Sequence, residues 1–439
     1  MIRLVFPSPL LSAIREGMAG SPVETCAVLF TYPAAKDRIL VHEGSIVPVS
    51  AYRLRTEIAA ELTPEYLFEV VRRARQLKAG IVLAHSHPAS AGQPCFSDVD
   101  DAGEKAMLDY LELRLPDHAH IAMVVGPEGM SARRIGSAEA IRIEEVGSSL
   151  RVCFDPSGEN ESDHSAIHDR QVRAFGAAGQ RLISRMKVGI VGLGGTGSVV
   201  AQELAHLGVG HFVLIDPDTL DTTNRNRVVG SEEGDLEKDK VAIASRLVGR
   251  INKDILVDVV KDTVIKTAIC ALLADCQFLF LCTDSHSSRA MVLKLCYQYM
   301  IPGIDVGVSI SVADDTIKYV AGRTQMIAPG LPCLLCTGSI DPNAIRQELM
   351  SPEHRAADPY FNGDGEPQPA VISLNATMSS LAVTMFLAAV AGVPMNARYQ
   401  RYDGIAGTVR PVAANAQDDC LVCSKAGALG RGQTKPLTL

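Results

Sequence analysis

Apolar and amphipathic stretches alternate through the first 150 residues or so of the chain. The runs CAVLF, IVLAHSH and IAMVV have the length and composition of buried strands. The stretches PEYLFEVVRRARQLKAG and SDVDDAGEKAMLDYLEL have the apolar spacing of helices. The pattern therefore predicts an α/β domain in this part of the chain.

A different order of elements begins at residue 186. MKVGIVGLGGTGSVVAQELAHLGVGHFVLID predicts a strand, a glycine turn, a helix and a second strand, which together form one βαβ unit of a parallel sheet. The polar stretch DPSGENESDHSA, which lies between the two patterns, is the best linker candidate. We predict an N-terminal domain over 1–150, a linker over 151–167 and a second α/β domain over 168–439.

Composition narrows the classes of function. The 439 residues are 47% hydrophobic and 21% charged, and the net charge of −8 does not suggest a nucleic-acid partner. The longest apolar run, SLAVTMFLAAVAGV at 380–393, is too short to span a bilayer and predicts a core helix. The sequence opens without a secretory pattern, so we expect a cytoplasmic protein. Its eleven cysteines are then expected to be metal ligands or core residues and not disulfides.

Two histidines end the strand-like run IVLAHSHP. Side chains alternate faces along a strand, so His85 and His87 point the same way, and two imidazoles on one face can begin a zinc site. Ser97 is a helix N-cap candidate, and Asp100 follows three residues later. Taken alone, the segment is more typical of a capping box beside two surface histidines. Glu24, which precedes the strand CAVLF, adds a carboxylate that can act as a general base on zinc-bound water.

This set of residues resembles the JAMM/MPN metalloprotease family, which cleaves isopeptide bonds or trims ubiquitin-like proteins. The resemblance covers roughly residues 1–145 and implies an MPN-type α/β domain. It implies the following roles: zinc ligation by His85, His87 and Asp100, activation of water by Glu24, and support of the tetrahedral intermediate by Ser97.

The spacing departs from the family in one place. The family usually has seven residues between the second histidine and the serine, whereas this chain has nine. A strict count puts Cys95 in the serine position and Asp98 in the ligand position. We prefer Ser97 and Asp100, because a loop absorbs two extra residues at little cost, and Asp98 stays open as the third ligand.

The glycine turn has the form G-x-G-x-x-G, after a strand and before a helix. Backbone at Gly192, Gly194, Gly195 and Gly197 can approach phosphates at the helix N-terminus. Asp216, at the end of the next strand, can hold ribose hydroxyls. These features fit NAD as well as ATP, so the glycine turn alone does not decide between the two nucleotides.

Residues farther along favour ATP. Asn224, Arg227 and Lys240 supply polar and cationic groups suited to three or more phosphate charges. Asp284 follows the apolar run FLFLCT, where it could hold a magnesium ion. The pyrophosphate of NAD does not require this arrangement.

Two C-x-x-C pairs close the pattern. Cys333 and Cys336 lie in CLLC, and Cys420 and Cys423 lie in CLVC. Paired motifs of this spacing predict a structural zinc site with four thiolate ligands.

Together these pieces resemble the ThiF/MoeB and ubiquitin-activating superfamily over about 165–425. The resemblance implies a Rossmann-like domain that adenylates the C-terminal carboxylate of a ubiquitin-like protein with ATP and magnesium. It implies these roles: ribose binding by Asp216, phosphate binding by Asn224, Arg227 and Lys240, and magnesium binding by Asp284. Arg170 matches an arginine that reaches the nucleotide of the partner subunit, which implies a homodimer.

A catalytic thiol found in many relatives is missing. They carry it between the two zinc pairs, whereas this chain has no cysteine between Cys336 and Cys420. The remaining candidates lie in core-like segments, where thiols are usually inert: Cys270, Cys276, Cys282 and Cys296. We therefore expect an acyl adenylate that is passed to a nucleophile elsewhere, and we do not favour a thioester on this chain.

The combined interpretation is a bifunctional enzyme that acts on the C-terminus of a ubiquitin-like protein. The first domain hydrolyses an amide next to that terminus, and the second activates the carboxylate, in concert with a conjugating enzyme if the pathway is conjugation. Alternatives are sulfur-carrier activation and release through a thiocarboxylate, adenylation of a short peptide, and a scaffold with inactive sites.

Overall fold

The computed structural model describes residues 1–35, 37–157, 166–351, 353–354 and 369–439. The chain forms two compact units. The first comprises Met1–Asn160 together with Leu429–Pro436, and the second comprises Glu161–Ala428 together with Leu437–Leu439.

The first unit is built on an eight-stranded mixed sheet with the order β10-β9-β1-β3-β2-β6-β7-β8. Its strands are β1 (Arg3–Pro7), β2 (Cys26–Pro33), β3 (Arg38–Ile46), β6 (Gly80–Ser86), β7 (Ile121–Val125), β8 (Met130–Arg134), β9 (Arg142–Val146) and β10 (Leu150–Phe154). A separate hairpin consists of β4 (Tyr52–Arg55) and β5 (Ala60–Leu62). The helices are α1 (Ser8–Ala19), α2 (Pro64–Leu77) and α3 (Asp98–Arg114).

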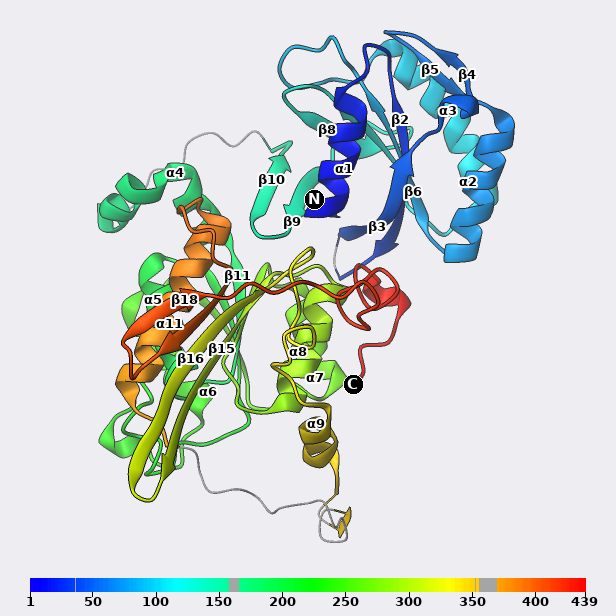
Figure 1. The fold of residues 1–439 in the computed structure, drawn as a ribbon. Coiled ribbons are helices and arrows are strands. Elements are labelled where there is room, and N and C mark those ends of the chain that lie inside the picture. The colour runs from blue at the N-terminus through cyan, green and yellow to red at the C-terminus, as the bar shows by residue number, and fades with distance from the viewer. Residues whose placement is uncertain (36, 158–165, 352, 355–368) are drawn as a thin grey trace. The chain divides into compact units, whose positions relative to one another are not determined.

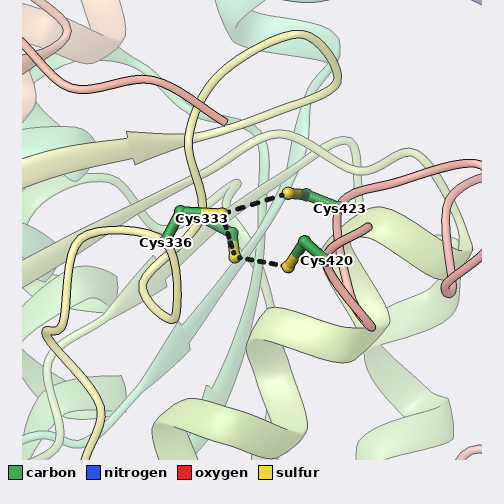
Figure 2. A group of neighbouring side chains, drawn as sticks. All are labelled: Cys333, Cys336, Cys420 and Cys423. Carbon is green, nitrogen blue, oxygen red and sulfur yellow. Dashed lines mark hydrogen bonds between the residues drawn. The ribbon is translucent and has the colours of Figure 1, made fainter. Parts of the chain in front are cut away.

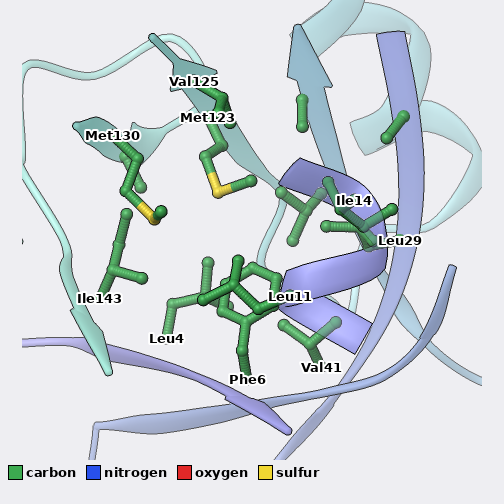
Figure 3. Close-up of a cluster of buried hydrophobic side chains, with 14 of the residues drawn as sticks. Leu4, Phe6, Leu11, Ile14, Leu29, Val41, Met123, Val125, Met130 and Ile143 are labelled. Carbon is green, nitrogen blue, oxygen red and sulfur yellow. The ribbon is translucent and has the colours of Figure 1, made fainter. Parts of the chain in front are cut away.

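Apolar side chains cover both faces of this sheet. On one face Leu11 and Ile14 of α1 pack with Phe6, Leu29 and Met123 from the strands (Figure 3). On the other face a second cluster joins α2 and α3 to the strands (Figure 1). Helices on both sides explain why the central strands read as continuous apolar runs.

The ends of the first unit involve segments outside the predicted range 1–150. Strand β10 pairs with β9 and continues to Phe154, so the N-terminal domain extends past residue 150 into the predicted linker. Most of the remaining linker, 158–165, lies outside the described residues. Residues Leu429–Pro436 belong to the first unit, where His42 Nδ1 lies 3.0 Å from the carbonyl oxygen of Leu429. A contact between residues so far apart in sequence leaves no local pattern by which it could be predicted.

The second unit contains an eight-stranded sheet with the order β13-β12-β11-β14-β15-β16-β17-β18. The strands are β11 (Lys187–Val191), β12 (His211–Ile215), β13 (Leu256–Val260), β14 (Phe278–Leu281), β15 (Gly303–Ala313), β16 (Thr316–Ile327), β17 (Tyr399–Asp403) and β18 (Thr408–Pro411). Strands β13 to β15 in this order pair in parallel, whereas β15 to β18 pair antiparallel (Figure 1). The predicted βαβ unit and parallel sheet are confirmed.

Helices flank the second sheet. They are α4 (Asp169–Arg185), α5 (Gly195–Leu207), α6 (Lys240–Ile251), α7 (Thr267–Ala271), α8 (His286–Gln298), α9 (Pro342–Leu349) and α11 (Ile372–Val390). Among the described residues, α11 alone is long and apolar enough to cross a membrane by length and composition. It packs instead on α5, β15 and β16 with Met378 and Phe386 fully buried, as predicted for a core helix.

Candidate functional sites

The two histidines of the first unit lie at the end of β6. His85 pairs with Cys26 of β2, and His87 follows the strand, where its backbone N–H donates to the carbonyl oxygen of Val125. The strand alternation places both imidazoles on one side, as expected. Their Nε2 atoms lie 3.1 Å apart.

Helix α3 brings Asp100 to these histidines. Ser97 is its N-cap: the Ser97 hydroxyl accepts from the backbone N–H of Asp100, and the Asp100 carboxylate accepts from the backbone N–H of Ser97. The same carboxylate lies 3.0 Å from His85 Nε2 through Oδ1 and 3.5 Å from His87 Nε2 through Oδ2. The capping box and the candidate metal site therefore share one side chain.

Electrostatics fix the ionised form of Asp100. Burial acts to raise the pKa of its carboxyl, but the hydrogen bonds to His85 and His87 outweigh burial and hold that pKa well below its usual range. The hydrogen bond to Asp100 in turn raises the pKa of His87 against the opposing effect of burial. A carboxylate and two imidazoles held together are the donor set that zinc prefers.

Glu24, which lies two residues before the start of β2, completes the group. Its side chain is almost fully buried, and Oε1 lies 3.7 Å from His87 Nε2. The Glu24 backbone is fixed by a bond from its N–H to the carbonyl oxygen of Thr56 and by a bond from Arg55 Nε to its own carbonyl oxygen. Burial raises the pKa of Glu24, and the two histidines partly oppose this shift. A raised pKa suits a carboxylate that must accept and then return a proton.

The structure separates the two candidates for the third ligand. Asp100 groups with His85 and His87, and the ligand atoms of the three residues lie within 4.8 Å of one another. Asp98 is the first residue of α3 and is exposed, and it is not part of this group. Cys95 is an exposed thiol in the preceding loop.

The spacing of the ligand atoms fits a zinc ion. Tetrahedral ligands at about 2.0 Å from zinc lie roughly 3.3 Å from one another. The separations of 3.0–3.5 Å between Asp100 and the histidines bracket that value. Ser97 Oγ donates to Asp100 Oδ2 at 2.8 Å, so the N-cap also orients the carboxylate. Zinc ligation by these residues remains a prediction.

In the second unit, the glycine turn links β11 to α5. Gly192 has φ of +88°, and a Cβ there would lie 2.8 Å from the backbone of Cys282. A Cβ on Gly197 would lie 1.8 Å from the carbonyl oxygen of Gly192, so only glycine lets the helix begin this close to the strand. A Cβ on Gly194 would meet open space, which leaves the N-terminus of α5 accessible to an anionic ligand.

Asp216 follows β12 and holds the glycine turn. Its Oδ2 accepts from the backbone N–H of Leu193 at 2.6 Å, and its Oδ1 accepts from the N–H of Asp218 at 2.8 Å. Burial raises the pKa of Asp216, whereas these two bonds and Lys240 act to lower it. The carboxylate thus shapes the loop, and its predicted contact with ribose is untested.

The predicted phosphate-binding groups lie beside the same turn. Lys240 is buried at the start of α6, and its Nζ lies 2.8 Å from Asp218 Oδ2. Arg227 Nη2 donates to Asn224 Oδ1 at 3.2 Å. A Cβ on Gly195 would lie 3.3 Å from Arg227 Cδ, so the arginine lies against the glycine turn. These contacts bring positive charge to the site where phosphates are expected.

Sequence reasoning missed two neighbours of this site. The amide of Asn375 on α11 is buried against Gly195, where an added Cβ would lie 2.0 Å from Asn375 Nδ2. The second neighbour is Glu348 of α9, which holds the turn after the exposed Asp284. The Glu348 carboxylate accepts from the backbone N–H of His286 at 2.9 Å and of Ser287 at 2.8 Å. Both neighbours come from helices distant in sequence, so no local signal could have revealed them.

Arg170 lies on α4 with its side chain exposed. Its expected reach into the nucleotide site of a partner subunit concerns a homodimer, and it stays a prediction.

The four cysteines of the two C-x-x-C pairs come together, as predicted (Figure 2). Cys333 Sγ lies 3.6 Å from that of Cys336 and 3.5 Å from that of Cys420, and Cys336 Sγ lies 3.5 Å from that of Cys423. Four sulfurs at about 2.3 Å from zinc would be roughly 3.8 Å apart, whereas a disulfide needs about 2.05 Å. A hydrogen bond with Cys423 lowers the pKa of Cys333 to about 5, although burial opposes the shift. The cluster therefore suits a structural zinc ion.

The remaining thiols of the second unit are buried, as expected. Burial raises the pKa of Cys270 and of Cys282 to about 12. Cys276 and Cys296 are also buried. Protonated and inaccessible thiols of this kind are poor nucleophiles.

Comparisons with known proteins cover mainly the second unit. The model of the ThiF family matches residues 168–422. The chain belongs to the ThiF family. The match does not extend to the N-terminal residues, so it says nothing of the histidine site.

Relatives of the ThiF-family domain include two curated proteins. Molybdopterin-synthase adenylyltransferase of Salmonella typhimurium is 29% identical over 38% of this chain and 66% of its own length. SAMP-activating enzyme E1 of Haloferax volcanii is 25% identical over 57% of this chain and 85% of its own length. A solved structure of E. coli MccB with MccA-N7isoASN covers 60% of this chain and 76% of its own, at 20% identity and a TM-score of 0.49, a likeness too weak to inform function.

The identity of the third ligand gives a first prediction. Asp100→Ala should lower the bound zinc from two ions per chain to one, measured by elemental analysis, because it removes a ligand. The same change removes the N3 carboxylate of the capping box and should cost about 1 kcal/mol of stability. Asp98→Ala should leave both ions bound, and loss of zinc in that variant would instead assign Asp98 as the ligand.

A second prediction concerns the four-cysteine cluster. Cys333→Ser should remove one zinc ion and reduce the free energy of unfolding of the second unit by about 3–5 kcal/mol, because binding of a structural metal is coupled to folding. Thermal unfolding and elemental analysis measure the two effects. Cys95→Ser, at an exposed thiol outside both clusters, is the control, and an unchanged melting curve for Cys333→Ser would count against a metal site.

Proposed function

We propose that the second unit adenylates the C-terminal carboxylate of a sulfur-carrier or other ubiquitin-like protein with ATP. The observation that carries the proposal is the open glycine turn with Arg227 against it, at the edge of a ThiF-family sheet from which the loops of Asp216 and Asp284 also leave. The names of two relatives support this reading, since one is a molybdopterin-synthase adenylyltransferase and the other a SAMP-activating E1.

The chemistry follows from the groups present. An oxygen of the carboxylate attacks the α-phosphorus of ATP, the bond to the bridging oxygen breaks, and pyrophosphate leaves with its electron pair. Arg227, Lys240 and the N–H groups at the start of α5 stabilise the negative charge that develops on the phosphates. Asp284 is the residue that would hold magnesium, which supplies further positive charge to the phosphates when bound.

The acyl adenylate is consumed by a nucleophile outside this chain. No cysteine lies between Cys336 and Cys420, and four thiols elsewhere in the unit are buried. Attack by an external sulfur donor would yield a thiocarboxylate, which is the outcome expected for a sulfur carrier. Attack by the thiol of a conjugating enzyme would yield a thioester on that enzyme.

Pyrophosphate exchange tests the adenylation. Purified chain, ATP, magnesium and candidate carrier proteins ending in Gly-Gly should support exchange of labelled pyrophosphate into ATP. Asp284→Ala should reduce the exchange rate at least 100-fold, and Asp254→Ala, at an exposed aspartate away from the site, should leave it unchanged. Equal rates in the two variants would remove Asp284 from the mechanism, and no exchange with any carrier would contradict the function.

We propose a second activity for the first unit, zinc-dependent hydrolysis of an amide at the C-terminus of a ubiquitin-like protein. The supporting observation is the group of His85, His87 and Asp100 with Glu24 beside it. Zinc bound there would lower the pKa of a water ligand, and Glu24 is placed to accept its proton. A pocket of about 680 Å³ adjoins Glu24, His85 and Asp100 and offers space for a substrate chain.

Both activities would act on the same terminus. Hydrolysis followed by adenylation would mature and then activate a carrier, whereas adenylation followed by hydrolysis would attach and then release one. We place both reactions in the cytoplasm and, by the predicted role of Arg170, in a homodimer.

Replacement of Glu24 tests the hydrolase separately from zinc binding. Glu24→Gln should abolish cleavage of a Gly-Gly amide substrate, because the amide cannot accept the proton, while both zinc ions stay bound. Cleavage is measured by mass spectrometry and zinc by elemental analysis. Glu139→Gln, at an exposed position, is the control; zinc loss in Glu24→Gln would make Glu24 a ligand and not a base.

A further inference from the structure

Three arginines lie side by side on neighbouring strands of the second sheet. Arg323 of β16 is in register with Arg401 of β17, and Arg401 is in register with Arg410 of β18. Directly opposed residues of paired strands project from the same face, so three guanidinium groups form one row, which we call the arginine row. A fourth, Arg289 of α8, approaches it near Gly307.

The chain neutralises only part of this charge. Asp305 of β15 is fully buried and lies 3.0 Å from Arg289 Nε and 2.8 Å from Arg323 Nη2. Arg401 and Arg410 have no ion pair among the residues that the structure describes, although Arg401 Nε donates to the hydroxyl of Tyr399 at 3.2 Å. Like charges directly opposed on paired strands destabilise a sheet, so the row is costly unless a ligand compensates it.

Asp403 also borders the row, and it is engaged elsewhere. Its Oδ1 accepts from the backbone N–H groups of Ile405 and Ala406, both at 3.0 Å, and so stabilises the turn between β17 and β18. Asp403 keeps its negative charge, so the four arginines face two carboxylates, Asp305 and Asp403, and the group retains an excess of positive charge.

The arginine row lines a pocket of about 610 Å³. A Cβ on Gly307 would lie 3.7 Å from both Arg289 Nη2 and Arg323 Nε, so the two guanidinium groups lie close to the backbone of β15 at this residue. Helix α11 packs on the other face, where Met378 contacts Gly322, the neighbour of Arg323 in the strand. The face that carries the row is thus the one that α11 leaves uncovered.

The pocket lies close to the expected site of carboxylate activation. Asp305 pairs with Leu281, the last residue of β14, and Asp284 follows three residues later. Arg289 lies in the first turn of α8, which begins two residues after Asp284. A chain that reaches the adenylation site from this side would pass along the arginine row.

We propose that the arginine row binds acidic side chains in the segment just before the activated C-terminus of the partner protein. The inference rests on the proposed adenylation and names a feature of its substrate. Guanidinium groups bind carboxylates in paired hydrogen bonds. The phosphates of ATP are not the expected ligand of the row, because the glycine turn, Arg227 and Lys240 are proposed to bind them. Three adjacent strands span about 10 Å, and alternate side chains of an extended peptide are about 7 Å apart, so two acids separated by one residue fit the row.

Peptide binding to the full-length chain tests the proposal without ATP. Fluorescent decapeptides ending in Gly-Gly would carry either two glutamates or two glutamines, separated by one residue, ahead of that terminus. The glutamate peptide should bind at least tenfold more tightly by fluorescence anisotropy, and the preference should shrink as salt is raised, because salt screens exposed charges. Equal affinity of the two peptides would overturn the proposal.

Charge reversal in the row supplies the matched variants. Arg401→Glu with Arg410→Glu should abolish the preference for the glutamate peptide and create one for a lysine peptide. Lys318→Glu reverses one charge on β16 outside the pocket, which is half the change in net charge of the double variant, and should keep affinity within twofold. An equal loss in Lys318→Glu would reduce the effect to net charge and refute a specific site.

Two further measurements separate the remaining explanations. Arg410→Gln relieves repulsion within the row, so its melting temperature should not fall, and a fall would give the arginine a structural role instead. If the double variant changes only the self-association of the chain by light scattering, a second copy fills the pocket and the proposal is wrong. Asp284→Ala should bind the glutamate peptide with unchanged affinity. Loss of pyrophosphate exchange can therefore be distinguished from loss of peptide binding at the arginine row.

Discussion

Parallel pairing of β11 with β12 and β14 is the constraint on which the chemistry of the second unit depends. Val191 is in register with both Ile215 and Leu281, so three strands end at one edge of the sheet. The glycine turn, the loop after Asp216 and the loop that carries Asp284 all leave from that edge. In sheets of this kind, ligands bind in the crevice at the carboxyl ends of the parallel strands. The cationic side chains of Arg227 and Lys240 would then make this crevice selective for phosphate.

The candidate site of the first unit is assembled from a different set of elements. Cys26 of β2 pairs with His85 of β6, which brings Glu24, two residues before Cys26, to the histidines, and α3 supplies the second carboxylate, Asp100, from its first turn. Because Asp100 belongs to the capping box and also faces the histidines, one side chain connects the start of α3 to the site. A change that loosens the helix start would therefore be felt at the histidines even without touching them.

The sequence alone predicted those parts of both sites that follow from short-range spacing. The histidine pair, the glycine turn and the C-x-x-C pairs have fixed spacings that strand and turn geometry impose locally. The choice between Asp98 and Asp100 needed the path of the preceding loop, which spacing cannot supply. Glu348, Asn375 and the arginine row depend on pairing and packing between distant segments, and so does the membership of Leu429–Pro436 in the first unit.

The segment Leu429–Pro436 has a consequence for the order in which the chain becomes complete. Residues 1–160 emerge from the ribosome first. The segment Leu429–Pro436, which also belongs to the first unit, is synthesised only after almost all of the second unit. The first unit can therefore collapse early but reaches its final packing last. A fragment cut at the apparent domain boundary would lack that piece however carefully the boundary were chosen.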